Sequence, residues 1–339
     1  MTNMSMATGP GLKPSPIRAS IDLDAPGLRH GFLKLPHSSD ASAWGSVMIP
    51  ICVACNGEGP TALLTGGNHG DEYEGPIALY KLAAAIDLAQ VRGRVIIVPA
   101  MNYPALEAGR RTSPIDNGNL NRVFPGSPSG TVTEKIADYF CRNLLPRADL
   151  VLDLHSGGRT LEFLPFAACH ALDDKEQEAR CRSAMEAFGA PYSVIMTEMD
   201  ASGLYDTVVE EFGKTFVTTE LGGGGTARAS TVRIAERGIL NLLRHAGILE
   251  GAPEPVESTL LTMPDEGYVV SEHHGLVEPC LDLGDPVAEG ELVARVFDQR
   301  RTAGATIEYR APVSGILAAR HFPGMVQAGD CLGVIAVPG

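Results

Sequence analysis

The sequence predicts an α/β protein with a mostly parallel, mixed sheet and helices on both faces, followed by a small all-β domain. Over residues 21–252 short apolar segments alternate with amphipathic helical patterns, as in a sheet buried on both faces. After a Gly/Pro-rich linker at 251–255 the pattern changes to short β-type segments with Gly-Asp turns. We therefore expect a flexible lead-in at 1–20, an α/β domain at 21–252 and a β domain at 253–339.

Apolar runs, helical periodicity and Gly/Pro positions predict the individual elements of the α/β domain. The stretch 100–130 is rich in Gly, Pro and Asn and is expected to be a long irregular loop, which in a compact domain usually has a functional role. Strands are expected at 28–37, 46–55, 61–66, 94–99, 150–154, 161–168, 192–197 and 215–219, and helices at 75–88, 132–145, 173–188, 204–212 and 227–249.

The C-terminal part contains a faint internal repeat. Residues 287–296 match residues 326–335 in their Val, Gly and terminal apolar positions. This pattern resembles the barrel-sandwich fold of biotinyl and lipoyl carrier domains. A carrier needs a lysine on an exposed hairpin, and no Lys occurs after Lys214. The carrier interpretation therefore fails, and we expect a rim or lid against the larger domain.

Composition excludes several classes of partner. The chain has 339 residues, a net charge of −14 and a pI near 5.1, which argues against binding to nucleic acid or to an anionic membrane. No apolar run approaches the roughly 18–20 residues of a membrane helix. The seven cysteines are an odd number without a secretory signal, so we expect reduced thiols and a cytoplasmic location. Cys52 and Cys55 lie in a predicted strand and are interpreted as buried thiols.

Three predicted strands end in residues that can perform chemistry. One strand is followed by His69, one ends at His155 and one leads to Glu220. In open α/β sheets ligands bind at the carboxyl ends of the strands. The sequence therefore predicts that these three side chains meet at one edge of the sheet.

His69 and Glu72 have the spacing of two metal ligands in one glycine-rich loop. Residues 37–40 and 170–173 have the same His-x-x-acid form, so spacing alone does not identify the pair. A hydrolytic zinc site needs three protein ligands and an open position for water, and His155 would supply the third ligand. Asp153 would share its side of the strand and could orient an imidazole. Alternatively, His155 is a hydrogen-bonded histidine at a strand end and Asp153 a turn former.

Glu220 is the candidate general base. A carboxylate beside a metal can take a proton from water and pass it to a leaving amine. Alternatively, Glu220 caps the following glycine loop or pairs with an arginine. Gly222–Gly225 do not form a phosphate loop, because no Gly-Lys-Ser/Thr follows them.

The loop 110–126 concentrates Asn and Arg in an acidic protein. An Asn-Arg pair suits a substrate carboxylate, because Arg offers a two-pronged charged contact and Asn a neutral donor. Arg110 or Arg111 could stabilise an oxyanion. Alternatively, this is a solvated loop whose arginines pair with surplus acids.

Four segments together resemble the succinylglutamate desuccinylase/aspartoacylase family, which is related to the zinc carboxypeptidases. The segments are 66–72 (Gly-Gly-Asn-His-Gly-Asp-Glu), 119–126 (Asn-Leu-Asn-Arg-Val-Phe-Pro-Gly), 153–155 and 219–220. The resemblance covers nearly the whole chain.

It implies one Zn²⁺ per chain with a defined set of residues around it. The implied metal ligands are His69, Glu72 and His155, and the implied catalytic residues are Glu220 and Arg111. The implied substrate-binding residues are Asn121 and Arg122 at the α-carboxylate, with Arg110 competing for the role of Arg111.

Within the family, residues 44–50, 98–104 and 216–225 are most similar to the branch that deacetylates N2-acetyl-L-2,4-diaminobutanoate in ectoine degradation. This resemblance implies release of acetate and L-2,4-diaminobutanoate. The family's aspartoacylases have an additional Arg shortly before the catalytic Glu for a second substrate carboxylate. Here that stretch carries Asp206, Glu210 and Glu211, and acids there would favour a substrate with an ammonium group. Alternatively, the three acids form an exposed helix face.

We therefore expect a zinc-dependent amidohydrolase acting on a small N-acyl amino acid. The alternatives are a desuccinylase, aspartoacylase or carboxypeptidase with another substrate, and a non-catalytic protein that senses a metabolite in the same pocket. Rates of hydrolysis of a panel of N-acyl amino acids distinguish the enzymes from one another. Turnover of any of these compounds distinguishes an enzyme from a metabolite sensor.

Overall fold

Four parallel strands form the centre of the larger sheet. In this computed structural model, which describes residues 13–197 and 202–339, they lie in the order β5 (Gly93–Val98), β4 (Thr61–Gly66), β6 (Leu150–His155) and β10 (Thr215–Glu220). Every residue of β4 and β6 is buried. The continuously apolar segments therefore mark strands covered on both faces, as predicted.

Antiparallel strands at the edges make this sheet mixed. On one side β3 (Ser46–Asn56) pairs with β5, and β2 (Gly27–Pro36) pairs with β3. On the other side β8 (Phe166–His170) is antiparallel to β10, and β9 (Tyr192–Met196) is parallel to β8. The parallel arrangement thus holds for the centre, whereas the β2–β3 hairpin extends one edge and the β8–β9 pair extends the other.

Part of the stretch that we expected to be a flexible lead-in has a defined structure. β1 (Arg18–Ala19) pairs antiparallel with β2, and Ile17 is buried in the main core. Pairing with the edge of β2 and burial of Ile17 tie this part of the N-terminal stretch to the domain. Residues 1–12 lie outside the described part of the chain.

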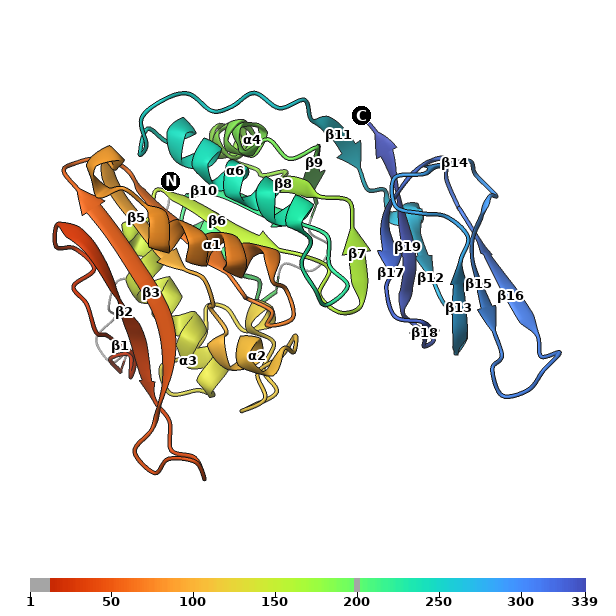
Figure 1. Ribbon diagram of the computed structural model, residues 1–339, viewed down its shortest axis with the longest axis horizontal. Helices are drawn as coiled ribbons and strands as arrows, with labels where there is room; N and C mark the ends of the chain where they lie inside the picture. The colour runs from red at the N-terminus through yellow and green to blue at the C-terminus, as the bar shows by residue number, and fades with distance from the viewer. Residues whose placement is uncertain (1–12, 198–201) are drawn as a thin grey trace.

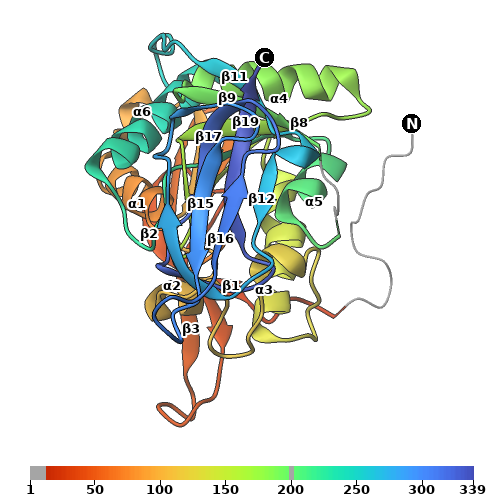
Figure 2. The same cartoon turned by 90° about the vertical axis from the view of Figure 1, so that its right-hand side faces the viewer.

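Helices lie on both faces of the sheet (Figures 1 and 2). α1 (Glu74–Ala85) and α6 (Ala229–His245) contact each other on one face, and α4 (Lys175–Phe188) packs beside α6. α3 (Val132–Tyr139) and α5 (Tyr205–Glu211) lie on the other. These positions agree with the predicted helices, except that α1, α3 and α6 end earlier.

Two segments differ from the prediction for a local reason. The expected strand 161–168 is two strands, β7 (Leu161–Phe163) and β8, because Pro165 lies between them and has no amide hydrogen for a ladder. The stretch 100–130 contains a short helix, α2 (Tyr103–Ala108), and a 3₁₀ turn at Leu120–Arg122. The predicted helix 132–145 continues past α3 as a π turn (Phe140–Leu144) and a 3₁₀ turn.

The C-terminal residues form short strands, as predicted. β11 pairs parallel with β9 and antiparallel with β19, so hydrogen bonds continue from the larger sheet into this region. A separate four-stranded sheet has the order β16-β15-β13-β18. The bounds are β11 (Thr259–Thr262), β12 (Tyr268–Val270), β13 (Gly275–Pro279), β14 (Pro286–Val287), β15 (Leu292–Phe297), β16 (Thr306–Arg310), β17 (Gly315–His321), β18 (Met325–Val326) and β19 (Cys331–Pro338).

Three apolar clusters hold these parts together. The largest surrounds the central strands, and a second lies wholly within residues 269–335. A third joins the two regions, because Phe166 and Val194 pack with Leu261, Ala318 and Ala336. A domain boundary at 252/253 stays a prediction. Among the described residues no helix is long and apolar enough to span a membrane.

Candidate active site

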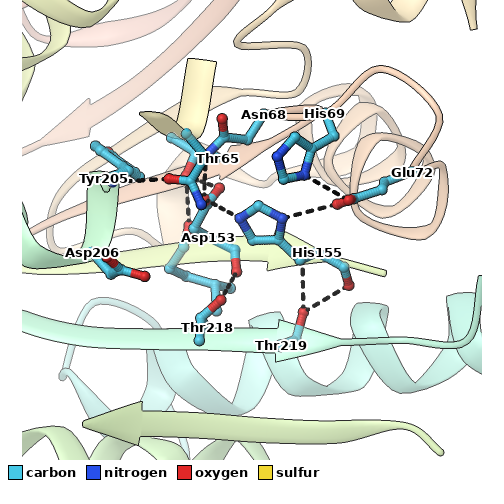
Figure 3. A network of polar contacts seen from close by, with 12 residues as sticks. Thr65, Asn68, His69, Glu72, Asp153, His155, Tyr205, Asp206, Thr218 and Thr219 are labelled. Carbon is cyan, nitrogen blue, oxygen red and sulfur yellow. Dashed lines mark hydrogen bonds and ion pairs between the residues drawn. The ribbon is translucent and has the colours of Figure 1, made fainter. Parts of the chain in front are cut away.

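Three of the predicted residues meet at the carboxyl end of the central strands. Glu72 lies between two imidazoles: its Oε1 is 2.7 Å from Nδ1 of His69, and its Oε2 is 2.9 Å from Nδ1 of His155 (Figure 3). All three side chains are buried, and their ligand atoms lie within 4.8 Å of one another. Neither His37 nor His170, which have the same spacing to an acid, belongs to this cluster.

Tight backbone packing positions the loop that carries His69 and Glu72. The loop connects β4 to α1, and Gly67 in it has φ +65°, a conformation that glycine adopts without strain. A Cβ on Gly70 would lie 2.0 Å from the carbonyl carbon of Ala105. The glycines therefore allow α2 to pack directly against the loop.

A second layer of hydrogen bonds orients His155. Its Nε2 lies 2.7 Å from Oδ2 of Asp153, and Asp153 also accepts hydrogen bonds from Thr65 and Asn68 (Figure 3). Asp153 lies within β6, so it is not a turn former. Because Nε2 faces Asp153, Nδ1 is directed toward Glu72, as is usual for a metal-ligating histidine with a carboxylate behind it.

The charges in the cluster suit a metal ion. Burial lowers the pKa of His69, although Glu72 opposes this. Burial also acts on His155, but Asp153 and Glu72 outweigh it and raise the pKa well above its usual value. Burial raises the pKa of Glu72, but the two imidazoles outweigh it and hold that pKa below its ordinary range. One carboxylate and two imidazoles, the donor set of hydrolytic zinc sites, are thus present in a buried cluster.

Glu220 ends β10 directly beside His155, its register partner in β6. Its Oε2 is buried and has no hydrogen-bond partner. Burial, followed by the negative charge of Glu72, raises the pKa of Glu220. Among the described residues no ion pair joins Glu220 to an arginine, and its unpartnered Oε2 leaves the carboxyl group free to exchange a proton.

One cavity of about 440 Å³ contains the cluster and Glu220. Arg111, Asn121 and Arg122 from the predicted Asn-Arg loop also line it. Arg110 is exposed and does not line the cavity. The remaining lining residues are Asp153, Ser156, Gly157, Thr160, Leu161, Phe163, Phe166, Met196, Leu204, Asp206, Phe216, Thr218 and Thr219.

The loop residues are held in different ways. Oδ1 of Asn121 accepts a hydrogen bond from the backbone N–H of Tyr205 at 2.9 Å, so the amide nitrogen is the end available to a ligand. The guanidinium of Arg111 lies 3.6 Å from Oε1 of Glu72, with about half of the side chain exposed. Arg111 is therefore next to the cluster of His69, Glu72 and His155, at the mouth of the cavity.

The three acids that we expected near a substrate ammonium group, Asp206, Glu210 and Glu211, lie in different places. Asp206, at the start of α5, lines the cavity. Glu210 instead binds Nδ1 of His170 at 2.7 Å, and Glu211 is exposed and outside the lining. Asp206 is thus the acid that the fold brings to the site.

Some lining residues were not singled out from the sequence. Phe216 and Thr218 precede Glu220 at intervals of two residues, so the alternation of a strand could have identified them. Ser156 follows His155 directly, and its backbone N–H donates to Glu72 at 3.2 Å. Phe166 and Met196 are apolar residues of β8 and β9, and only the tertiary structure brings them to the cavity.

Comparisons with known proteins agree over nearly the full length. Residues 58–246 match the family model described as the succinylglutamate desuccinylase/aspartoacylase catalytic domain. An N-alpha-acetyl-L-2,4-diaminobutyric acid deacetylase of Halomonas elongata is 59% identical over 335 residues, or 98% of each chain.

Two solved structures are similar at 60% identity. One is the product-bound ectoine utilization protein EutE of Ruegeria pomeroyi, with a TM-score of 0.94 over 96% of this chain and 100% of that chain. The other is a succinylglutamate desuccinylase from Silicibacter sp. TM1040, with a TM-score of 0.95 over 97% of this chain and 100% of that chain. The similarity therefore includes the C-terminal strands as well as the catalytic region.

Proposed function

The chain belongs to the succinylglutamate desuccinylase/aspartoacylase family, and from that premise we propose that it hydrolyses N2-acetyl-L-2,4-diaminobutanoate to acetate and L-2,4-diaminobutanoate in ectoine degradation. The observation that supports this substrate is the 59% identity, over 98% of both chains, to the N-alpha-acetyl-L-2,4-diaminobutyric acid deacetylase of Halomonas elongata. The observation that carries the chemistry is the buried His69/Glu72/His155 cluster next to Glu220 in one cavity.

His69, Glu72 and His155 would hold one Zn²⁺ per chain. The support is their buried convergence and their donor set of two imidazoles and one carboxylate. When bound, zinc would polarise the acyl oxygen and lower the pKa of water to about 7. Binding would also displace the proton that the carboxylates favour on His155, because a ligating imidazole is neutral.

Glu220 acts as the general base and then as the general acid. It takes a proton from the attacking water and transfers it to the amide nitrogen as the C–N bond breaks, so that acetate and the amine leave. Its unpartnered, buried oxygen supports this role. A raised pKa also suits a group that must hold the proton between the two steps.

Arg111, Asn121 and Arg122 bind the negative charges of the substrate. Arg111 stabilises the oxyanion, since it is the arginine that lines the cavity beside Glu72. Asn121 and Arg122 bind the α-carboxylate, with the amide nitrogen of Asn121 as one donor. Arg110 does not line the cavity and therefore has no comparable support.

Asp206 binds the side-chain ammonium group of the substrate. It lines the cavity, whereas no arginine occurs between Arg182 and Arg228 to offer a site for a second carboxylate. A carboxylate in a cavity attracts an ammonium group and repels a carboxylate. This charge favours diaminobutanoate over aspartate or glutamate derivatives.

The test compares metal content and turnover in the same preparations. We expect the purified protein to hold zinc and to hydrolyse N2-acetyl-diaminobutanoate with a kcat/KM at least about 100-fold above that for succinylglutamate or N-acetylaspartate, since one misplaced charge costs several kcal/mol. Glu220→Gln should keep zinc and lose about 10²–10⁴-fold in kcat. Turnover unchanged in this variant would remove Glu220 from the mechanism.

A desuccinylase is the second candidate, favoured by the name of one solved structure at 60% identity. It predicts the opposite order of substrates in the same panel. If succinylglutamate is preferred, the deacetylase assignment is wrong while the metal site and Glu220 stand. Binding of these compounds without any turnover would instead indicate a metabolite sensor.

We also propose that residues 253–339 form a separate barrel-sandwich-like β domain on a zinc-carboxypeptidase-like α/β domain. The support is the separate apolar cluster of residues 269–335. A cytoplasmic location is proposed with it, supported by the fact that all seven cysteines are free.

A further inference from the structure

One wall of the cavity is the three-residue strand β7. Leu161 and Phe163 line the cavity, and the strand pairs antiparallel with β17 from the C-terminal region. Additional backbone hydrogen bonds flank the pairing: Phe322 N–H donates to the Thr160 carbonyl at 3.0 Å, and Leu164 N–H donates to the Ala318 carbonyl at 2.8 Å. The C-terminal region therefore holds the outer edge of this wall.

The other edge of β7 contacts the glycine loop that follows Glu220. The N–H of Phe163 donates to the Gly222 carbonyl, and the N–H of Gly224 donates to the Leu161 carbonyl, both at 3.0 Å. A Cβ on Gly224 would lie 2.5 Å from the ring of Phe322. The wall, the loop after the proposed base and the C-terminal region are thus in mutual contact.

Glu162 occupies the middle of β7 and points away from the cavity, since neighbouring side chains of a strand alternate. Its side chain is 1% exposed, although it is charged in solution. Its Oε2 lies 2.9 Å from Nε and 2.8 Å from Nη2 of Arg320, which is its direct partner across the β7–β17 ladder. Its Oε1 forms an ion pair with Arg228, although no hydrogen bond of normal geometry reaches this oxygen.

The two arginines belong to separate segments. Arg320 is in β17 and also contacts Asp282, whereas Arg228 immediately precedes α6, three residues after the glycine loop. A single buried carboxylate therefore connects β7, β17 and the start of α6. A buried carboxylate depends on such partners, because removal of one leaves a charge without compensation.

We propose that Glu162 is a positioning residue that fixes the β7 wall of the cavity, so that Arg320, which does not line the cavity, sets how large an acyl group the site accepts. This inference rests on the proposed deacetylase function. Leu161 and Phe163 are the apolar side chains on the cavity side of the strand that Glu162 anchors. Movement of the strand would widen the cavity and weaken its contacts with a small acyl group.

The test uses Arg320→Met in the full-length zinc-loaded protein, with acetyl, butanoyl and hexanoyl derivatives of diaminobutanoate. We expect KM for the acetyl substrate to rise about 10-fold or more and the acetyl-to-butanoyl ratio of kcat/KM to fall at least about fivefold, because small displacements of a positioning element have large kinetic effects. Zinc content should not change. Arg320→Lys, which keeps the charge, should lie between wild type and Arg320→Met.

Arg295→Met is the matched control. Arg295 also lies in a C-terminal strand and pairs with two carboxylates, Glu278 and Glu308, but it is outside the cavity wall. It should keep the wild-type KM and acyl ratio. Equal changes in both variants would mean a general loss of stability and would overturn the proposal, as would a wild-type acyl ratio in folded Arg320→Met.

A readout without substrate separates this inference from the proposed function. Amide hydrogen exchange at 157–164 and 221–225 should accelerate in Arg320→Met and not in Arg295→Met. If the wild-type protein hydrolyses no acyl-diaminobutanoate, the deacetylase proposal fails. Hydrogen exchange still tests whether Glu162 and its arginines hold β7 in place. If Arg320→Met does not fold, Arg228→Met replaces it. The Arg228 side chain is 55% exposed, and its loss removes only one of the two ion pairs of Glu162. This variant should also accelerate exchange in the same segments. Unchanged hydrogen exchange in the folded variants would contradict the proposal that Glu162 fixes β7.

Discussion

Asp206 is the residue at which substrate charge can be tested most directly. Asp206→Asn removes the negative charge and keeps the size of the side chain. We expect KM for N2-acetyl-diaminobutanoate to rise about 10–100-fold, because a hydrogen bond between charged groups contributes about 1.5–3 kcal/mol. The value of kcat should change by less than about threefold, since the charge is not part of the reacting amide. Steady-state kinetics measure both parameters.

Glu211→Gln is the control for this change. It lies on the same helix, α5, but is exposed and does not line the cavity. N-acetyl-2-aminobutanoate, which lacks the ammonium group, provides a second control, because Asp206→Asn should not raise its KM. An equal rise for both substrates would mean that Asp206 shapes the cavity without binding the ammonium group.

Residue types and spacing predicted which residues meet in one cavity, but not which of several similar residues would lie there. His69 and His170 have the same spacing to an acid, yet His170 pairs with Glu210 while His69 faces Glu72. Likewise Arg110 and Arg111 are adjacent, and only Arg111 lines the cavity. The direction of a side chain in an irregular loop depends on the turns of that loop, which local sequence does not specify.

At the level of elements, the glycine loop between β10 and α6 is a tightly constrained connection of the site. Gly223 has φ +135°, and a Cβ there would lie 2.3 Å from the Leu161 carbonyl oxygen. We expect Gly223→Ala to lower the free energy of unfolding by about 3 kcal/mol or more, because strain and overlap with backbone add together. Loss of activity should exceed what the unfolded fraction explains, since the loop follows Glu220. Thermal unfolding and specific activity measure the two effects.

Gly213→Ala separates strain from overlap. Gly213 lies just before β10 with φ +70°, but nothing lies within 4 Å of a Cβ at that position. This variant should lose only the roughly 1–2 kcal/mol of a left-handed conformation and keep full activity when folded. Equal destabilisation in the two variants would show that the close approach to β7 is unimportant.

The elements with continuous apolar runs were predicted well, because such runs have one stable solution in a sheet covered on both faces. β4 agrees with its prediction at both ends, and β6 and β10 end one residue beyond it. Features that depend on a distant partner were not predicted. The strand expected at 161–168 includes β7, but its division from β8 and the pairing of β7 with β17, more than 150 residues later, were not foreseen. The same long-range contact makes Glu162 an interior residue, which its own segment does not indicate.

At the scale of the whole molecule, the candidate metal site joins segments that are distant in sequence. His69 and Glu72 come from the loop after β4, whereas His155 ends β6, a parallel neighbour of β4. The unfolded chain cannot hold these three side chains together. Metal binding should therefore be coupled to folding of the entire sheet.

Removal of the metal tests this coupling. We expect chelation to lower Tm, and zinc added back at about 100 times its Kd to restore about 2.7 kcal/mol of stability, which is a few degrees in a chain of this size. Glu72→Gln should remove the response to zinc, because it takes away the carboxylate between the two imidazoles. His37→Gln is the matched control: it has the same His-x-x-acid spacing but lies outside the cluster, so its Tm should follow zinc as in wild type. A zinc response that persists in Glu72→Gln and disappears in His37→Gln would move the metal away from the carboxyl end of the central strands.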